Sequence, residues 1–186
     1  MNLSNKAALR RQMRARRVVL GRHNPHAARE AAAHLPAALI ARAHVIGGYH
    51  PVGAELDPWP LLRRFVDADV VLPFAVRPDA PLVFRLWREG DPLVRDALGV
   101  SAPSELRGEA RPDILIVPVL AFDRRGGRLG QGAGCFDRTL ATLRAQGPVT
   151  ALGLSVAGQE VESLPLEPHD QRLDAVVTEL GYIELG

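Results

Sequence analysis

The sequence predicts an α/β fold in which helices cover both faces of a mainly parallel, Rossmann-like sheet, giving a three-layer sandwich. Short apolar runs recur along the chain with helix-like segments between them, an alternation typical of this class. The run DILIVPV at 113–119 has no polar alternation, which indicates a strand covered on both faces. No repeat or linker divides the chain, so residues 1–186 are expected to form a single domain.

The order of the elements follows from the same pattern. Helices are expected at 4–20 and 25–42, which are rich in Ala, Leu and Arg, and again at 58–66 and 136–146. The expected strands are the apolar runs at 44–49, 69–74, 81–87, 113–119, 150–156 and 174–179.

Composition narrows the class of protein. Apolar residues make up 47% and charged residues 24% of the chain, as in soluble globular proteins. No apolar stretch is long enough for a transmembrane helix, and the first residues lack the apolar core of a secretory signal. Cys135 is the only cysteine, which excludes an internal disulfide and a cysteine-rich zinc site. We therefore expect a cytoplasmic protein with no membrane partner.

Positive charge is concentrated at the start of the chain. Residues 1–29 contain eight Lys or Arg and no Asp or Glu, whereas residues 30–186 contain fifteen Lys or Arg against twenty-one Asp or Glu. Helical spacing places four of the basic residues on one face, namely Lys6, Arg10, Arg14 and Arg17. The pattern is compatible with a contact to an anion or nucleic acid, with an organelle transit peptide, or with a solvated helix face.

The segment RRGGRLGQGAGCFDR at 124–138 contains five glycines and precedes a predicted helix. Glycines allow backbone N–H groups to approach an anion, and the helix N-terminus adds a favourable dipole. Arg128 supplies a full positive charge, so the segment is a candidate phosphate-binding loop. It matches neither a Walker A loop nor a dinucleotide fingerprint, because Cys135 occupies the third glycine position. A flexible surface loop is the alternative.

The longer segment PDILIVPVLAFDRRGGRLGQGAGCFDR resembles the 5-formyltetrahydrofolate cyclo-ligase family in its ordered series of strand, Ala-Phe-Asp, Gly-x-Arg-Leu-Gly-x-Gly-x-Gly and Asp-Arg. The resemblance implies that ATP phosphates are bound by Arg128, Leu129, Gly130, Gln131, Gly132, Ala133, Gly134, Cys135 and Phe136. It also implies that Asp137 helps to hold Mg²⁺, an ion that prefers oxygen ligands and shares them with phosphates. The alternative for Asp137 is a residue favoured at a helix start by the dipole.

Three further segments carry the resemblance. The pair Lys6-x-x-x-Arg10 is similar to the family's first helix, which implies that helix 4–20 forms part of the ATP site and argues against removal of residues 1–29 as a transit peptide. In YHPVGAELDPWPLL, at 49–62, the resemblance implies that His50 and Glu55 line the folate site; an exposed loop carboxylate is the alternative for Glu55. In LPLEPHDQRLDAVVTE, it favours Asp170 as a second acidic group at the metal.

Trp87, in FRLWREGDPL, resembles a family tryptophan near the pterin. A core or edge-strand aromatic is the alternative. Two positions depart from the family pattern: Cys135-Phe136 replaces a pair that usually ends in tyrosine, and Gln131 stands where a cation is often found.

The resemblance implies an ATP- and Mg²⁺-dependent enzyme, with residues Lys6 and Arg128 as catalytic clamps, that converts 5-formyltetrahydrofolate to 5,10-methenyltetrahydrofolate. Such an enzyme is expected to act as a monomer on a reduced folate, without nucleic acid. The departure at Cys135-Phe136 leaves a catalytically silent relative as one alternative. A nucleic-acid-binding module is another, but 5% aromatic residues and an acidic remainder of the chain argue against it.

Overall fold

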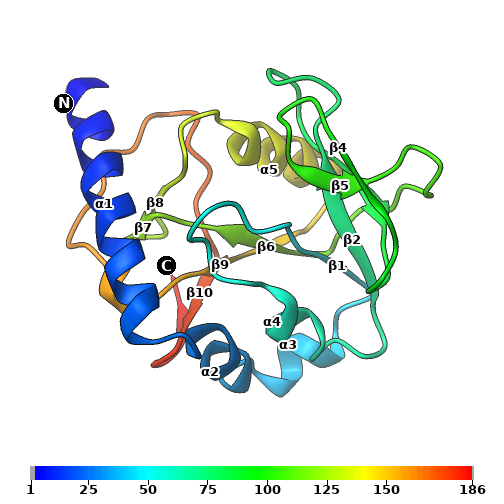
Figure 1. Ribbon diagram of the computed structural model, residues 1–186, viewed down its shortest axis with the longest axis horizontal. Coiled ribbons are helices and arrows are strands. Elements are labelled where there is room, and N and C mark those ends of the chain that lie inside the picture. The colour runs from blue at the N-terminus through cyan, green and yellow to red at the C-terminus, as the bar shows by residue number, and fades with distance from the viewer. Residues whose placement is uncertain (1–2, 186) are drawn as a thin grey trace.

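A seven-stranded sheet crosses the centre of the molecule, with the strand order β11-β10-β9-β6-β1-β2-β3 (Figure 1). The computed structural model describes residues 3–185, so the first two residues and the last residue of the predicted domain lie outside the described residues. Strands β10, β9, β6, β1 and β2 run parallel to one another, while β11 pairs antiparallel with β10 at one edge and β3 pairs antiparallel with β2 at the other. The predicted fold class is therefore confirmed.

All six predicted strands are present. They are β1 (Val45–Gly47), β2 (Asp69–Phe74), β3 (Val83–Leu86), β6 (Ile114–Pro118), β9 (Thr150–Leu154) and β10 (Ala175–Thr178). The prediction missed the edge strand β11 (Gly181–Glu184) and two small hairpins, formed by β4 (Leu93–Arg95) with β5 (Ser101–Pro103) and by β7 (Ala121–Phe122) with β8 (Arg128–Leu129). Strands β4, β5, β8 and β11 lie in segments without long apolar runs, and β7 follows directly on the run that contains β6.

The helices are α1 (Leu3–His23), α2 (Ala27–Ala33), α3 (Ala37–Ala41), α4 (Trp59–Leu62) and α5 (Cys135–Gln146), with a short 3₁₀ helix η1 (Ala157–Gln159). The predicted helix at 25–42 is wrong as a single element, because Pro36 separates α2 from α3. Proline has no N–H to donate and disfavours helical geometry in the residue before it. The predicted helix at 58–66 is also too long, because α4 ends at Leu62. The chain then continues with hydrogen bonds to the third residue back, from Arg64 N–H to the Leu61 carbonyl and from Phe65 N–H to the Leu62 carbonyl.

Helices cover both faces of the sheet and produce three layers (Figure 1). Helices α2, α3 and α4 cover one face, and α5 covers the other. Ile116 belongs to the core beneath α2–α4, whereas the adjacent Leu115 belongs to the core beneath α5. Consecutive residues of β6 are thus buried on opposite faces, which explains its unbroken apolar sequence.

Helix α1 lies at one side of the sheet, next to the β7–β8 hairpin (Figure 1). Met13 is 1% exposed and belongs to a separate apolar cluster with Leu120 and Leu129. This packing directs the basic face of α1 toward the segment that follows β8.

The strand order also determines where a ligand cavity can form. From β1 the chain moves to β2 on one side, and it later returns to β6 on the other side. In open α/β sheets the connections diverge at such a switch point, and a crevice forms beyond the carboxyl ends of the two strands. Residues that follow β1 and β6 are therefore brought to one place.

Because Leu140 of α5 is fully buried against the sheet, we expect Leu140→Ala to lower the free energy of unfolding by about 2–5 kcal/mol through loss of burial and a residual cavity. Urea denaturation followed by circular dichroism measures this. Gln146→Ala, an exposed position on the same helix, is the control and should change stability by less than about 0.5 kcal/mol. Equal effects of the two substitutions would contradict the described packing of α5.

Candidate active site

A cavity of about 530 Å³ opens beyond the carboxyl ends of β1 and β6. It is lined by α1, the loop after β1, the β4–β5 hairpin, the segment from β8 into α5, and the loop at 167–170. The residues predicted for the site that line this cavity are Lys6, Arg10, His50, Glu55, the run from Arg128 to Asp137, and Asp170. Of the residues predicted for the site, Trp87 alone lies elsewhere.

The five glycines of the glycine-rich segment have two different tasks. Gly126, with a φ of +80°, lies in the turn between β7 and β8, where a Cβ would come within 2.7 Å of the Leu173 carbonyl oxygen. Gly132 and Gly134 also have positive φ values, of +113° and +67°, and they line the cavity with Gly130. We call residues 130–134 the glycine loop, since the glycines of the segment that line the cavity lie in this part.

Asp123 stabilises the turn that leads to the glycine loop, and its role was not predicted. Its buried carboxylate accepts hydrogen bonds from the backbone N–H groups of Arg125 (3.0 Å), Gly127 (2.9 Å) and Leu164 (2.8 Å). Burial opposes ionisation, but these hydrogen bonds outweigh it and hold the pKa of Asp123 below its usual value. The Ala-Phe-Asp motif in the sequence was the available signal for this anchor.

Arg128 is placed to bind an anion. Its side chain is only 4% exposed, and Nη2 donates a hydrogen bond of 2.6 Å to Asp137 Oδ1. Burial lowers the pKa of Arg128, and the charge of Asp137 opposes that shift. Nη1 is buried and has no hydrogen-bond partner within residues 3–185. A buried guanidinium N–H without a partner at a cavity wall suits a phosphate or carboxylate oxygen.

Asp137 lies in the first turn of α5 and lines the same cavity. Besides Arg128, its Oδ1 accepts a hydrogen bond of 3.0 Å from the backbone N–H of Gln171. The residue therefore has the helix-start position that the dipole favours and also faces the candidate site, so the two readings of the sequence are compatible.

Lys6 and Asp170 form a second polar group in the cavity. Lys6 Nζ donates to Asp170 Oδ2 at 3.0 Å, and the backbone N–H of Glu167 donates to the same oxygen at 2.8 Å. Burial raises the pKa of Asp170, but these two contacts outweigh it and leave the pKa below its usual value. Glu167, His169 and Asp170 present ligand atoms within 4.8 Å of one another. Carboxylate oxygens of this kind suit a divalent cation.

Glu55 is not the exposed loop carboxylate that the alternative reading describes, since its side chain is only 6% exposed. Its Oε2 accepts a hydrogen bond of 3.0 Å from the backbone N–H of Val52, and Arg17 lies 3.8 Å from Oε1. The neighbouring Tyr49 donates its hydroxyl to the Leu56 carbonyl at 2.7 Å. Burial, followed by the charge of Glu55, raises the pKa of Tyr49, which keeps it a hydrogen-bond donor.

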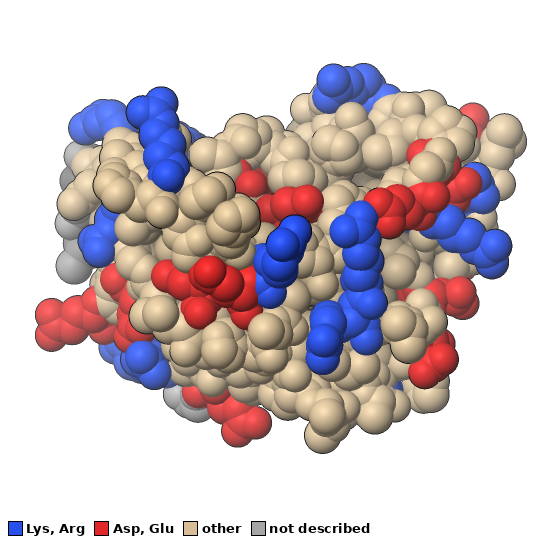
Figure 2. Space-filling view, turned by 60° about the horizontal axis from the view of Figure 1, so that its bottom comes forward, with Lys and Arg blue, Asp and Glu red and all other residues tan. Residues whose placement is uncertain are grey.

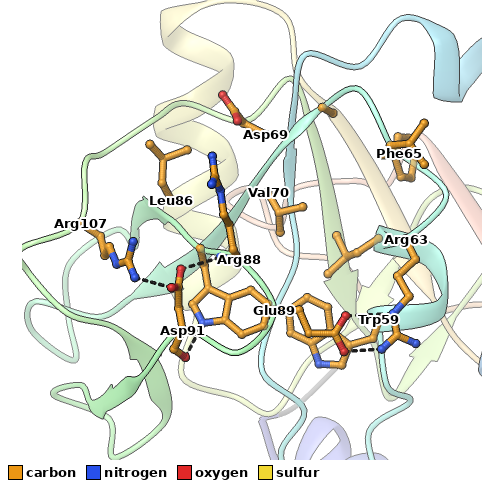
Figure 3. Close-up of a pocket in the computed structure, with 14 residues that line it drawn as sticks. Trp59, Arg63, Phe65, Asp69, Val70, Leu86, Arg88, Glu89, Asp91 and Arg107 are labelled. Atoms are coloured by element: carbon orange, nitrogen blue, oxygen red, sulfur yellow. Dashed lines mark hydrogen bonds and ion pairs between the residues drawn. The ribbon is translucent and has the colours of Figure 1, made fainter.

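A different cavity, of about 650 Å³, lies near the amino end of β2, and other residues of its wall are shown in Figure 3. Trp87 is among the residues that line it. Its ring stacks on Trp59 with centroids 4.5 Å apart, and its Nε1 donates to the Asp91 carbonyl at 3.2 Å. The rim carries two closed ion pairs, Arg63 with Glu89 and Arg107 with Asp91. Trp87 is therefore a packed aromatic, and its predicted place beside His50 and Glu55 is corrected.

The β4–β5 hairpin contributes residues that the sequence did not reveal. Asp96 Oδ1 accepts hydrogen bonds of 2.9 Å from the N–H groups of Leu98 and Val100, and Oδ2 accepts one of 3.0 Å from Ala75 N–H. The turn of the hairpin is thereby fixed to the end of β2, and Leu98 and Val100 line the cavity. An Asp followed three residues later by Gly99 is a turn signal that could have located it.

The sequence model of the 5-formyltetrahydrofolate cyclo-ligase family matches residues 2–179. The chain belongs to this family. A cyclo-ligase from Mycolicibacterium smegmatis is 40% identical over 144 residues, which cover 70% of this chain and 71% of that protein. The cyclo-ligase of Escherichia coli K12 is 32% identical over 149 residues, which cover 75% and 80% of the two chains.

Solved structures support the fold of this cyclo-ligase family member. The NMR structure of 5,10-methenyltetrahydrofolate synthetase from Aquifex aeolicus superposes with a TM-score of 0.80 at 24% identity, over 97% of this chain and 92% of that one. The synthetase from Mycoplasma pneumoniae gives 0.68 at 21% identity, over 94% and 98%. Within residues 3–185, none of the helices has both the length and the apolar character needed to span a membrane.

Because Asp123 accepts several backbone hydrogen bonds as a buried carboxylate, Asp123→Asn should lower the free energy of unfolding by about 2–3 kcal/mol at pH 7. The Asn side chain has an NH₂ group in place of one carboxylate oxygen, and this group would face a backbone N–H donor without accepting its hydrogen bond. Since the folded-state pKa is depressed, the contribution of the carboxylate is complete at neutral pH and is lost as the pH falls below about 4, so the difference between the proteins should shrink there. Urea titrations at pH 7 and pH 3.5 measure both effects, with the exposed Asp67→Asn as control. An unchanged stability at pH 7 would contradict the anchor role.

Proposed function

We propose that this chain catalyses the ATP-dependent cyclisation of 5-formyltetrahydrofolate to 5,10-methenyltetrahydrofolate, with release of ADP and phosphate. The observation that carries the proposal is that one cavity joins an anion-binding wall to an apolar wall with a fixed carboxylate. Family membership supports the activity, and the cavity geometry supports the assignment of residues. The expected cytoplasmic location and monomeric state stay predictions.

The anion-binding wall suits the phosphates of ATP. Arg128 has a buried Nη1 without a partner within residues 3–185, and Lys6 is a second cation that lines the cavity. The glycine loop lines the same cavity, and α5 begins directly after it, so the positive end of its dipole adds to the field. The two side-chain cations, the backbone of the glycine loop and the dipole of α5 thus all favour negative charge in this cavity, which suits a multiply charged anion.

Another part of the cavity wall suits a reduced folate. Leu82, Leu98 and Val100 provide apolar surface for flat rings, while Glu55 and His50 provide polar atoms at the end of β1. A carboxylate held in place by Val52 N–H is a suitable acceptor for the N–H groups of a pterin. This arrangement of an apolar slot with a few placed polar groups is typical of small-molecule sites.

In the proposed reaction the formyl oxygen attacks the γ-phosphorus of ATP, and the bond from that phosphorus to the β,γ-bridging oxygen breaks to release ADP. N10 then attacks the activated formyl carbon, the carbon–oxygen bond breaks, phosphate leaves, and the N10 proton passes to solvent. Phosphoryl transfer of this kind depends mainly on positioning and charge neutralisation. Arg128 and Lys6 would supply the charge, and no side chain is assigned as a general base.

The acidic residues of the cavity fit a magnesium ion. Asp137 and Asp170, with Glu167 close to the latter, would provide the oxygen ligands, and the ion would neutralise phosphate charge when bound. Lys6 and Arg128 each pair with one of these carboxylates. They would hold the carboxylates ionised and oriented.

The structure gives less support to a nucleic-acid-binding module. The basic stripe of α1 is directed inward, where Arg10 Nε donates to the Gly130 carbonyl at 3.1 Å and Arg14 and Arg17 contact Gln131 and Glu55. Figure 2 shows a face of the molecule on which basic and acidic side chains are interspersed rather than gathered into a basic area. The side chains of the stripe are thus held in contacts within the protein, and two of them, Lys6 and Arg17, are paired with carboxylates.

The test of the proposal is incubation of the purified protein with 5-formyltetrahydrofolate and Mg²⁺, with and without ATP, while the near-ultraviolet absorbance of methenyltetrahydrofolate is recorded. An increase that requires ATP is expected, and it would show that the buried Cys135 with Phe136 is a functional replacement for the usual aromatic pair. Folate binding by a folded protein without turnover would instead support the silent relative.

Loss of the Arg128 charge should slow turnover strongly. We expect Arg128→Ala to reduce kcat by about 100-fold, the effect of removing one preorganised contact to developing charge. Arg124→Ala is the matched control, because Arg124 lies in the same hairpin but is exposed at the surface. Thermal melting of both variants would identify any loss of folding, and turnover of a folded Arg128→Ala protein at the wild-type rate would refute the assignment.

A further inference from the structure

Gln131 joins two parts of the cavity wall that are 76 residues apart in sequence. Its Nε2 donates to Glu55 Oε1 at 3.1 Å, and its Oε1 accepts from Arg14 Nε at 3.0 Å. A side-chain amide has a donor end and an acceptor end, so it can connect a carboxylate to a guanidinium. The two partners also determine the orientation of the amide, because a flipped amide would place its NH₂ group against Arg14 and its oxygen against the Glu55 carboxylate.

Helix α1 fixes the two ends of this connection. Arg14 Nη2 donates at 3.0 Å to the backbone carbonyl of Gln131, so Arg14 holds both the side chain and the main chain of that residue. Arg17, one helical turn further on, lies 3.8 Å from the carboxylate of Glu55. The Arg17 and Glu55 side chains are only 7% and 6% exposed, and charges sheltered in this way interact more strongly than charges in water.

The connection links the two halves of the proposed site. The glycine loop, which contains Gln131, belongs to the phosphate-binding wall, and Glu55 belongs to the folate-binding wall. A ligand that orders the glycine loop also restricts Gln131, and through it Glu55. A second ligand that uses Glu55 then meets a carboxylate whose hydrogen bond to Gln131 is already held in place, so its binding loses less conformational entropy.

We propose that Gln131 is a positioning residue that couples ATP binding to folate binding by tying the glycine loop to Glu55. This inference rests on the proposed function, which assigns the two walls to these ligands. The coupling is positive: each ligand increases the affinity for the other by the same factor, as thermodynamic linkage requires. Gln131 thereby acts through Glu55 and the loop backbone.

The test is calorimetric titration of 5-formyltetrahydrofolate into the protein with and without a saturating non-hydrolysable ATP analogue and Mg²⁺, where no turnover occurs. In the wild type the folate Kd should fall at least about fivefold when the analogue is present, the lower range of known couplings. In Gln131→Met, which keeps length but removes both hydrogen bonds, the ratio should fall to less than about twofold. The reverse titration, analogue into protein with and without folate, should give the same ratios.

Two further variants separate coupling from general damage. Gln12→Met makes the same substitution at an exposed position of α1 and should keep the wild-type ratio. Arg14→Met removes the support of Gln131 without touching Glu55 and should reduce the ratio. If Gln131→Met changed the folate Kd equally with and without the analogue, the ratio would stay at its wild-type value. Gln131 would then be only structural, and the coupling would be overturned.

A wild-type ratio near one would also overturn the coupling, while binding of both ligands would leave the proposed function intact. Binding of neither ligand by the folded wild type would contradict the proposed function, and the coupling with it.

Discussion

The contact between the basic face of α1 and the glycine loop is the interaction on which the cavity depends. Met13 attaches the helix to the β7–β8 hairpin, and Arg10 then reaches the Gly130 carbonyl while Lys6 reaches Asp170. Without α1, the cavity would lose the Lys6 cation and the wall that encloses the loop. The basic residues concentrated at the start of the sequence therefore have a structural role, since side chains of the α1 stripe make contacts within the fold.

The sheet explains why the remaining groups meet at this place. A crevice forms at the switch point between β1 and β6, and the segments that follow these two strands carry polar residues of the site. Asp123 secures the turn before Arg128, and Asp96 secures the hairpin that carries Leu98 and Val100. Both are carboxylates that accept backbone N–H groups, so the flexible parts of the wall are fixed by local hydrogen bonds rather than by packing alone.

The sequence predicted the interior of the fold better than its edges. A run such as 113–119 indicates a strand buried on both faces, whereas the hairpin strands and β11 are determined by turns and tertiary contacts. Pro36 was a visible reason to divide helix 25–42. The glycine loop and the acidic residues followed from an ordered motif, but the contact between Gln131 and Glu55 spans the fold and has no local signal. Trp87 was misplaced because a tryptophan that stacks on Trp59 resembles, in sequence, one that binds a ring.

A crystal structure of the protein with Mg²⁺, a non-hydrolysable ATP analogue and 5-formyltetrahydrofolate would test the central claim, that one cavity positions both substrates, most directly. The terminal phosphate is expected at hydrogen-bond distance, about 3 Å, from Arg128 Nη1, with the formyl group beside it and the pterin near Glu55. A nucleotide bound elsewhere, for instance in the cavity beside Trp59 and Trp87, with Arg128 Nη1 still lacking a partner, would contradict it.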